Sequence, residues 1–252
     1  MKNYKVVVAE RFNKESDSDA KNSIYSESHP IGAYSRRVFC SELQKLVNWY
    51  TEKGKVLQEN KLMDIGCGSG KTLSIFASHG FDKKNMTGID LSETRINRGI
   101  KTHPEINFFC KDALSFKLEN RDFDLITAFD LFSHLTTKQQ IIEGLSNVRN
   151  HLNEEGLFLW YDIYSKDHFD SPENVESSGF SKDQMIQIAE EAGFKVVYSK
   201  KLFKLFFNRF HSIYQAKRIP FTVLRMLETI LPGSPGNLML VFEKCPSKPK
   251  KG

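Results

Sequence analysis

The 252-residue sequence lacks the markers of several protein classes. Its first residues contain only a short apolar run, Val6 to Ala9, before Glu10, so we expect no cleavable signal peptide. No uninterrupted apolar stretch approaches the roughly 20 residues of a membrane-spanning helix. Four scattered cysteines without a C-x-x-C pair favour free thiols in a reducing cytoplasm over disulfides or zinc. We therefore expect a cytoplasmic protein without a bound metal.

Acidic residues are scarce near the end of the sequence. Residues 200–252 hold 11 Lys and Arg against 2 Asp and Glu, a net charge of +9, whereas residues 1–199 hold 25 against 29, a net charge of −4. A basic surface confined to one part of the chain argues against coating by nucleic acid, and we expect no DNA partner.

The middle of the sequence alternates between segments with strand and helix periodicity. Strands are predicted at residues 61–65, 85–90, 107–110, 122–128, 157–163, 195–198 and 238–242, and helices at 69–79, 92–100, 137–151 and 181–192. Such alternation indicates an α/β fold in which mostly parallel strands are joined by right-handed crossovers.

Segments outside this alternation give the expected domain organisation. It comprises an N-terminal helical lid or cap (1–60, with a helix at 35–53), a core (61–198 and 237–245), a basic-aromatic helical insertion (199–236) and a frayed tail (246–252).

Aromatic residues in the insertion recur at helical spacing. They are Phe203, Phe206, Phe207, Phe210 and Tyr214. Seven Lys and Arg between residues 200 and 225 accompany them, with no acid before Glu228. One interpretation is an amphipathic cover packed on the core, and a second is a surface for an anionic lipid, a lipid-linked or phosphate-bearing acceptor, or a membrane face. Aromatic-basic RNA binding is a third.

The stretch "LMDIGCGSGKTL", residues 62–73, combines parts of three ligand-binding loops. A triphosphate loop requires glycine at position 65, where Ile65 stands, and a dinucleotide loop requires glycine at position 71, where Lys71 stands. Asp64 would also bring a carboxylate next to phosphate. S-adenosylmethionine (SAM) has no phosphate and carries a sulfonium and an amino group, so it favours a nearby carboxylate.

Two further acids follow the next two strands. Asp90, in "TGIDLS", lies 20 residues past Gly70, where a carboxylate suits the two hydroxyls of a ribose. Asp112, in "CKDAL", could accept from an adenine amino group, with Ala113 as a backbone donor to the ring. Either acid taken alone is also typical of a helix cap or a turn.

Together these motifs resemble those of class I SAM-dependent methyltransferases. The ordered series is "LMDIGCGSG…TGIDLS…CKDAL…FDLITAFDLFSHL…LNEEGLFLW", across residues 61–163, and "FSKDQMIQIAEEAGFKVV" continues it to residue 198. The resemblance implies a Rossmann-like, seven-stranded sheet with an antiparallel last strand, helices on both faces, and SAM as cofactor. It implies cofactor contacts by Arg36, Asp64, Gly66, Cys67, Gly68, Gly70, Asp90, Leu91, Asp112, Ala113 and Phe129.

A hydroxyl acceptor needs a base, because its proton leaves as the new bond forms. Candidates stand at the ends of the fourth and fifth strands, where open α/β sheets bind ligands. His134 is the first choice, since its ordinary pKa of about 6.5 suits a base, and it can alternatively only pack against SAM. The other predicted catalytic residues are Asp162 and His168. Predicted substrate contacts are Tyr25, Tyr34, Asp130 and Tyr161.

The expected function is O-methylation of a small molecule or saccharide, such as a sugar of a bacterial surface polysaccharide or a glycosylated metabolite. Within the class, a natural-product or quinone-type O- or N-methyltransferase is the alternative. From another class, the alternative is a catalytically silent SAM-fold protein that binds a partner through residues 199–236. The basic insertion also leaves open a peripheral location at the inner membrane face.

Overall fold

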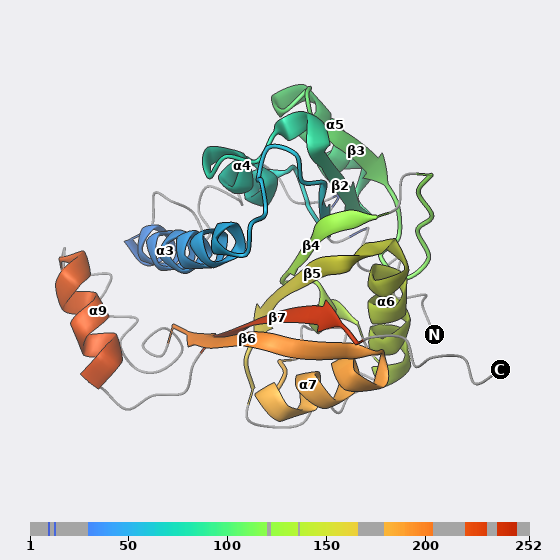
Figure 1. Cartoon of the computed structure of the whole chain (residues 1–252). Coiled ribbons are helices and arrows are strands. Elements are labelled where there is room, and N and C mark those ends of the chain that lie inside the picture. Colours follow the sequence, from blue (N-terminus) through green and yellow to red (C-terminus); the bar gives the residue numbers. More distant parts are fainter. Residues whose placement is uncertain are drawn as a thin grey trace.

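The computed structural model of the chain describes residues 10, 13, 30–119, 122–135, 137–165, 179–203, 220–230 and 236–245. They build one seven-stranded sheet in the order β3-β2-β1-β4-β5-β7-β6 (Figure 1). Its strands are β1 (Leu62–Ile65), β2 (Met86–Asp90), β3 (Asn107–Cys110), β4 (Phe123–Phe129), β5 (Leu152–Ile163), β6 (Phe194–Leu202) and β7 (Asn237–Lys244). Strand β7 runs antiparallel to both of its neighbours, and the other pairs are parallel. The predicted fold class is therefore confirmed.

Helices cover both faces of the sheet, as Figure 1 shows. On one face lie α3 (Pro30–Glu52), α4 (Lys71–Ser78) and α5 (Glu93–Thr102); on the other lie α6 (Lys138–His151) and α7 (Lys182–Glu191). Two 3-10 turns, η1 (Lys83–Asn85) and η2 (Phe132–His134), follow α4 and β4. Because both faces are covered, the central strands β1 and β2 are buried along their whole length.

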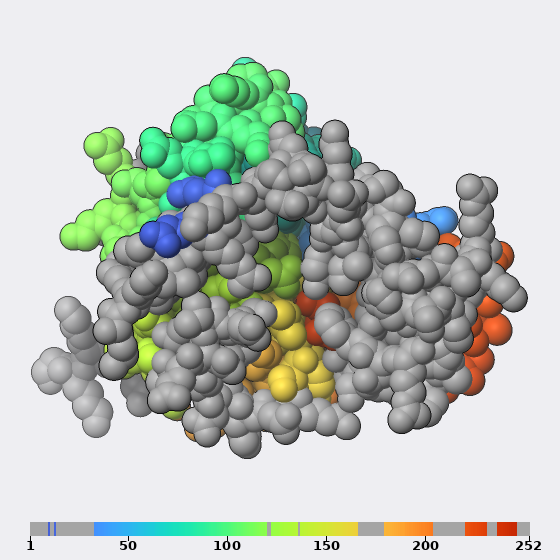
Figure 2. Space-filling view, turned by 180° about the vertical axis from the view of Figure 1, so that it is seen from behind, coloured from blue at the N-terminus to red at the C-terminus, as the bar shows by residue number. Residues whose placement is uncertain are grey.

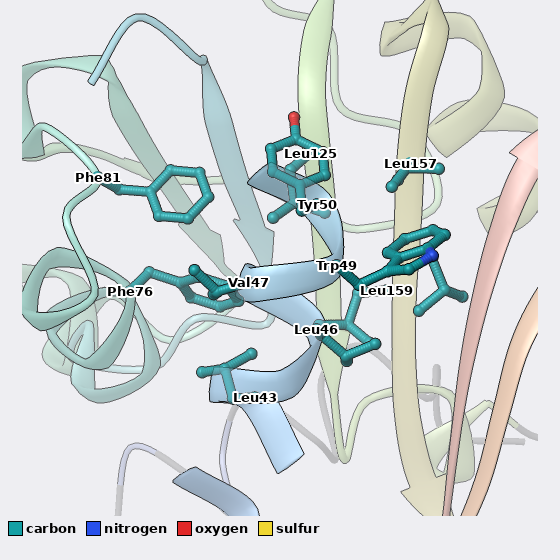
Figure 3. A pocket seen from close by; sticks show the side chains of 11 residues that line it. Leu43, Leu46, Val47, Trp49, Tyr50, Phe76, Phe81, Leu125, Leu157 and Leu159 are labelled. Atoms are coloured by element: carbon teal, nitrogen blue, oxygen red, sulfur yellow. The ribbon is translucent and has the colours of Figure 1, made fainter. Parts of the chain in front are cut away.

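Helix α3 packs its apolar face on the sheet, which accounts for the helical spacing of its apolar residues. Figure 3 shows Leu43, Val47 and Tyr50 pointing into an apolar pocket that strand residues such as Leu125 and Leu159 complete. The pocket has a free volume of about 20 Å³, which accommodates a water-sized molecule and no cofactor. It is therefore part of the packing between α3 and the sheet.

Helix α9 (Phe221–Ile230) lies on the outer side of α3. Leu224 is buried and belongs to the same apolar cluster as α3, and the Phe221 ring lies 5.5 Å from the Tyr34 ring. Figure 2 shows the orange surface of α9 at the edge of the molecule, away from the green surface of α5 and β3. No helix of the described ranges is long and apolar enough to cross a membrane.

Strand β6 is longer than the sequence predicts. It continues to Leu202, so residues 199–202 belong to the sheet, because they pair with β7 through Leu202 and Asn237. Phe203 then adopts a left-handed backbone conformation (φ 61°) and is buried, so it does not begin the predicted helical stripe. The remaining aromatic residues of that stripe lie outside the described residues, as does the tail from residue 246.

The ring of Phe108 fills space that three glycines leave open. A Cβ atom added at Gly70, Gly88 or Gly99 would lie 2.6, 2.9 or 3.0 Å from this ring, closer than real Cβ contacts at the first two positions. Cys67 adds to the crowding, since its Sγ would lie 2.7 Å from a Cβ at Gly88. The absence of side chains at these glycines thus allows α4, α5 and β2 to approach β3.

Candidate active site

The glycine loop leaves β1 and enters α4 with three left-handed residues. Gly66, Gly68 and Gly70 have φ values of 75°, 54° and 84°. A Cβ at Gly66 would lie 3.1 Å from Leu131, and the crowding at Gly70 comes from Phe108. At Gly68, by contrast, the nearest neighbour of an added Cβ is Arg95 at 3.9 Å. An added Cβ is thus least crowded at Gly68, where the loop leaves the most room for a ligand, and the predicted cofactor contacts of the three glycines stay predictions.

Asp90, at the end of β2, holds the loop in place. One oxygen accepts from the backbone N–H of Gly68 over 2.9 Å, and the other accepts from the backbone N–H of Ser92 over 2.8 Å. Each carboxylate oxygen has a second lone pair, so the buried acid retains acceptor capacity next to the open side of Gly68.

Asp64 lies beneath the loop on β1. Its Oδ1 accepts from the hydroxyl of Thr127 over 2.6 Å. Burial raises the pKa of Asp64 to about 7; the Thr127 hydrogen bond acts in the opposite direction, and the charge of Asp90 adds to the rise. A positively charged ligand close to Asp64 would favour the ionised carboxylate and would be stabilised by it.

The remaining predicted cofactor residues at the β2 and β3 ends have local roles. Asp112 accepts from the backbone N–H of Leu114 over 3.2 Å and from the hydroxyl of Ser115 over 2.9 Å, so it closes the turn after β3. The carbonyl of Ala113 accepts from the Asn147 side chain over 3.3 Å. Leu91 is half-buried in the turn between Asp90 and α5.

Cys67 points away from the open side of the loop. The thiol is buried against β2 and contacts the carbonyl of Gly68 over 3.4 Å. Burial, followed by the charges of Asp64 and Asp90, raises the pKa of this thiol. The side chain of Cys67 therefore fills the inside of the loop. Only the backbone groups of Cys67 are left to contact a ligand.

A pocket opens beside the loop at the carboxyl edge of the sheet. It has a free volume of about 180 Å³ and opens to solvent. Its lining comes from α3, α4 and the ends of β4, β5 and β6: Ser35, Arg36, Phe39, Lys71, Thr72, Ile75, Phe129, Asp130, Tyr161 and Phe203.

Aromatic rings form one wall of this pocket. The rings of Phe39, Phe129 and Tyr161 lie 5.3 to 5.8 Å apart, in tilted and edge-to-face arrangements. Arg36 of α3 and Lys71 of α4, both cationic, also line the pocket. The pocket therefore offers apolar ring contacts and positive charge to one ligand.

Asp130 lies directly after β4 in a left-handed conformation (φ 49°) that is uncommon for a residue other than glycine. Its N–H donates to the carbonyl of Tyr161 over 2.9 Å, which ties the turn to β5. The residue is exposed at the pocket mouth, yet its carboxyl is surrounded closely. Loss of water contact, and then the charge of Asp162, raises the pKa of Asp130.

Asp162 is fully buried on β5. Its oxygens accept from the backbone N–H groups of Ser133 over 3.0 Å and Ile163 over 2.8 Å. Burial raises its pKa, and hydrogen bonds from Ser133 and its neighbours oppose this rise, so we expect Asp162 to ionise before Asp130. Since its carboxylate has no exposed surface, it positions η2 and does not suit the predicted role of a base in contact with substrate.

Two further predicted residues, His134 and Tyr34, do not line the pocket. His134 is half-buried at the end of η2, and it is not among the residues that line the pocket. Tyr34 is buried against Phe221 of α9, so it packs inside the protein where we predicted a substrate contact. Tyr25 and His168 lie outside the described residues. The structure brings together Arg36, Phe129, Asp130 and Tyr161.

Several lining residues were missed by the sequence analysis. Lys71, Thr72 and Phe39 line the pocket and are not among the predicted site residues. Phe203 was placed in the insertion, although a signal existed, since it follows a strand directly. Nothing in the sequence singled out Thr127 as the partner of Asp64, because it lies inside an apolar strand.

Comparisons with known proteins bear on this arrangement. Residues 62–156 match a family described as a methyltransferase domain. They include the glycine loop, Asp90 and the turn after β4. Residues 62–156 thus form a methyltransferase domain.

Relatives and solved structures agree with this methyltransferase domain. The chain is 32% identical over 100 residues to a ubiquinone biosynthesis O-methyltransferase of Coxiella burnetii, which is 38% of this chain and 41% of that protein. It is 26% identical over 159 residues to 24-methylenesterol C-methyltransferase 2 of Oryza sativa subsp. japonica, 55% of this chain and 42% of that protein. The chain thus matches less than half the length of these curated relatives.

One solved structure resembles this chain over nearly its whole length. Magnesium protoporphyrin IX methyltransferase from Synechocystis PCC 6803, with bound SAM, has a TM-score of 0.63 and 14% identity, and it covers 97% of this chain and 98% of its own. At 14% identity, this similarity is evidence for the fold alone. The predicted fold is confirmed. The match of residues 62–156 agrees with the predicted methyltransferase family and its SAM cofactor.

Proposed function

We propose that this chain is a SAM-dependent methyltransferase that methylates a hydroxyl group of a small molecule held in the pocket beside the glycine loop. The observation that carries the proposal is the position of this pocket. Lys71 and Thr72 continue the loop into the pocket, while Phe129 and Asp130 border it from the end of the adjacent strand β4. A donor at the loop and an acceptor in the pocket would therefore be neighbours.

The residues around the loop fit the cofactor. Asp90 would accept from the ribose hydroxyls, and the open side of Gly68 would admit the ligand close to the backbone. Ionised Asp64 would attract the positive end of the ligand, and Arg36 would pair with its carboxylate. When bound, SAM supplies an electrophilic methyl group on a good leaving group. Positioning by the chain then contributes much of the acceleration.

Asp130 is our candidate for the base. It lines the pocket, whereas His134 does not and Asp162 has no exposed surface. Its raised pKa makes the carboxylate a stronger base than an ordinary aspartate, so it suits removal of a hydroxyl proton. The buried Asp162 would orient the preceding turn and keep the pKa of Asp130 high.

The acceptor class follows from the pocket wall. The rings of Phe39, Phe129 and Tyr161 favour an acceptor with an apolar or planar ring next to the reacting hydroxyl. The ubiquinone O-methyltransferase relative supports this quinone-type acceptor. The predicted saccharide acceptor is the second candidate, since an aromatic wall with a carboxylate such as Asp130 also suits a sugar ring and its hydroxyls.

The test uses methyl-labelled SAM with two acceptor panels, hydroxylated aromatic compounds and free or glycosylated sugars. We expect label transfer to the aromatic panel and its loss in Asp130→Asn, with binding of S-adenosylhomocysteine retained. Transfer to sugars alone would favour the saccharide acceptor. Cofactor binding without transfer to either panel or to fractionated cell extract would favour a silent binding protein and contradict the proposal.

A further inference from the structure

Among the described residues, exposed apolar side chains are concentrated on α9. Among the described residues, six large apolar side chains are exposed, and three of them lie on this ten-residue helix. Met226 and Ile230, exposed to 54% and 67%, are the two most exposed of the six, and Val223 is exposed to 39%. Single exposed apolar residues are ordinary, but a group of them on one element indicates an interaction site.

These three residues form a stripe along one side of the helix. Positions 223, 226 and 230 follow the i, i+3, i+7 spacing of a helical face. The opposite side of α9 is already used, since Leu224 is buried and Glu228 is almost fully buried. The stripe is therefore the outward face of a helix whose inward face is occupied.

Helix α9 is attached to the helix that lines the pocket. Arg225 lies 3.5 Å from the buried carboxylate of Glu42 on α3 and 3.4 Å from Glu228. The guanidinium of Arg37 lies 4.1 Å from the centroid of the Phe221 ring, and the N-terminal half of α3 carries Arg36 and Phe39 into the pocket. Whatever binds the stripe is thereby coupled to the pocket through α3.

The sequence around α9 indicates the charge of the partner. Residues 200–225 contain seven Lys and Arg and no Asp or Glu, and the whole segment from 200 to 252 has a net charge of +9. A second copy of the chain would carry the same positive charge and be repelled. A stripe of three side chains is also far from the roughly 20–30 residues per partner of a stable protein interface. An apolar stripe next to a basic segment fits the headgroup region of an anionic bilayer.

We propose that the face of α9 formed by Val223, Met226 and Ile230 docks on an anionic membrane surface. The excess of positive charge in this part of the sequence favours an anionic surface over a neutral one. The three side chains would enter the interface between headgroups and acyl chains, and the helix would lie parallel to the surface. The pocket, joined to α9 through α3, would then be held near the membrane. This inference is independent of the proposed reaction, because it concerns only where the chain binds.

Vesicle co-sedimentation tests the proposal with the full chain. One set of vesicles contains phosphatidylcholine alone, and the other contains an equimolar mixture with phosphatidylglycerol. We expect binding to the anionic vesicles only. Binding should weaken at about 0.5 M salt, because the Debye length is then shorter than the roughly 8 Å of physiological salt. The variant Met226→Ser/Ile230→Ser should bind about tenfold more weakly or worse, since it removes most of the apolar surface of the stripe.

Val56→Ser/Ile100→Ser is the matched control, because it removes two exposed apolar side chains that lie outside α9. It should bind like the unaltered chain, and both variants should retain binding of S-adenosylhomocysteine, which shows that the fold is intact. Three results would overturn the proposal: no binding of the unaltered chain to anionic vesicles, equal binding by the stripe variant, or a dimer in light scattering that the stripe variant dissociates. The third would make the face an interface between copies.

Discussion

The carboxylate of Asp90 accepts a hydrogen bond from the backbone N–H of Gly68 over 2.9 Å, and this contact fixes the glycine loop to the end of β2. It places the open side of the loop beside an acid with remaining acceptor capacity. The arrangement suits a ligand with neighbouring hydroxyls and no phosphate at this position.

Gly68→Arg should abolish binding of S-adenosylhomocysteine in calorimetry, because the side chain would occupy the open space beside the loop. Gly54→Arg is the matched control: Gly54 also has a positive φ, 81°, and an added Cβ there meets nothing within 4 Å. Both variants should lose roughly 1–2 kcal/mol of stability from the left-handed backbone. Retained binding in Gly68→Arg would refute the placement of the cofactor.

Asp64→Asn should flatten the pH dependence of stability. The pKa of Asp64 is about 7 in the folded chain, against about 3.9 in an unfolded one. Between these values the native state binds the additional proton, so the contribution of this group to the free energy of unfolding falls as pH rises from about 4 to 7. Thermal unfolding across this range should show a smaller loss in Asp64→Asn, which keeps an acceptor for Thr127. Asp183→Asn, at an exposed position, should behave like the unaltered chain.

Asp130→Asn should lower kcat by about 10²–10⁴-fold, the usual contribution of a general base, with little change in cofactor affinity. In the unaltered chain, the rising limb of the pH–rate profile should lie above the ordinary range of a carboxyl group, because the pKa of Asp130 is raised. His134→Ala should retain most of the activity. A large loss of activity in His134→Ala alone would return the role of base to the histidine.

Arg225→Ala should loosen α9 from α3. Among the described residues, the buried Glu42 would keep Lys45, at 2.8 Å, as its one charged partner. We expect faster proteolysis near residues 220–230 and a lower Tm, by roughly 2–4 °C for each kcal/mol lost. Lys195→Ala removes the exposed ion pair with Glu243 and serves as the control, with little expected change. Equal protease sensitivity of the two variants would show that Arg225 does not anchor the helix.

Periodicity predicted the strands and helices of the core closely, because each is bounded by a local signal. Ser92, Thr137 and Ser181 cap their helices, as side-chain acceptors do at helix starts. The lengths of β5 and β6 were underestimated: β5 begins at Leu152, five residues before its predicted start, and the exposed lysines of β6 do not alternate with apolar residues. They are held in the strand by pairing with β7, which comes from more than 30 residues later in the sequence.

Site residues were predictable from the sequence where they stand at the end of a strand. They were not predictable where tertiary contacts decide whether a side chain is buried. Asp90, Phe129 and Asp130 all stand at such ends. Tyr34 was assigned to the substrate because an aromatic residue near a lid suits both stacking and packing, and only the position of α9 shows that it packs on Phe221. The same reasoning applies to Asp162, whose burial depends on η2 folding over it.

The ring of Phe108 constrains how this sequence can vary over evolution. Gly70, Gly88 and Gly99 come from three different elements, yet each owes its missing side chain to the same ring. An alanine at any one of them would crowd this ring, at Gly88 it would also crowd Cys67, and at Gly70 it would strain the left-handed backbone, so these positions and Phe108 should change together or not at all. A library randomised at all four should accordingly yield folded variants in which added carbon atoms at the glycines are matched by atoms removed from the phenylalanine.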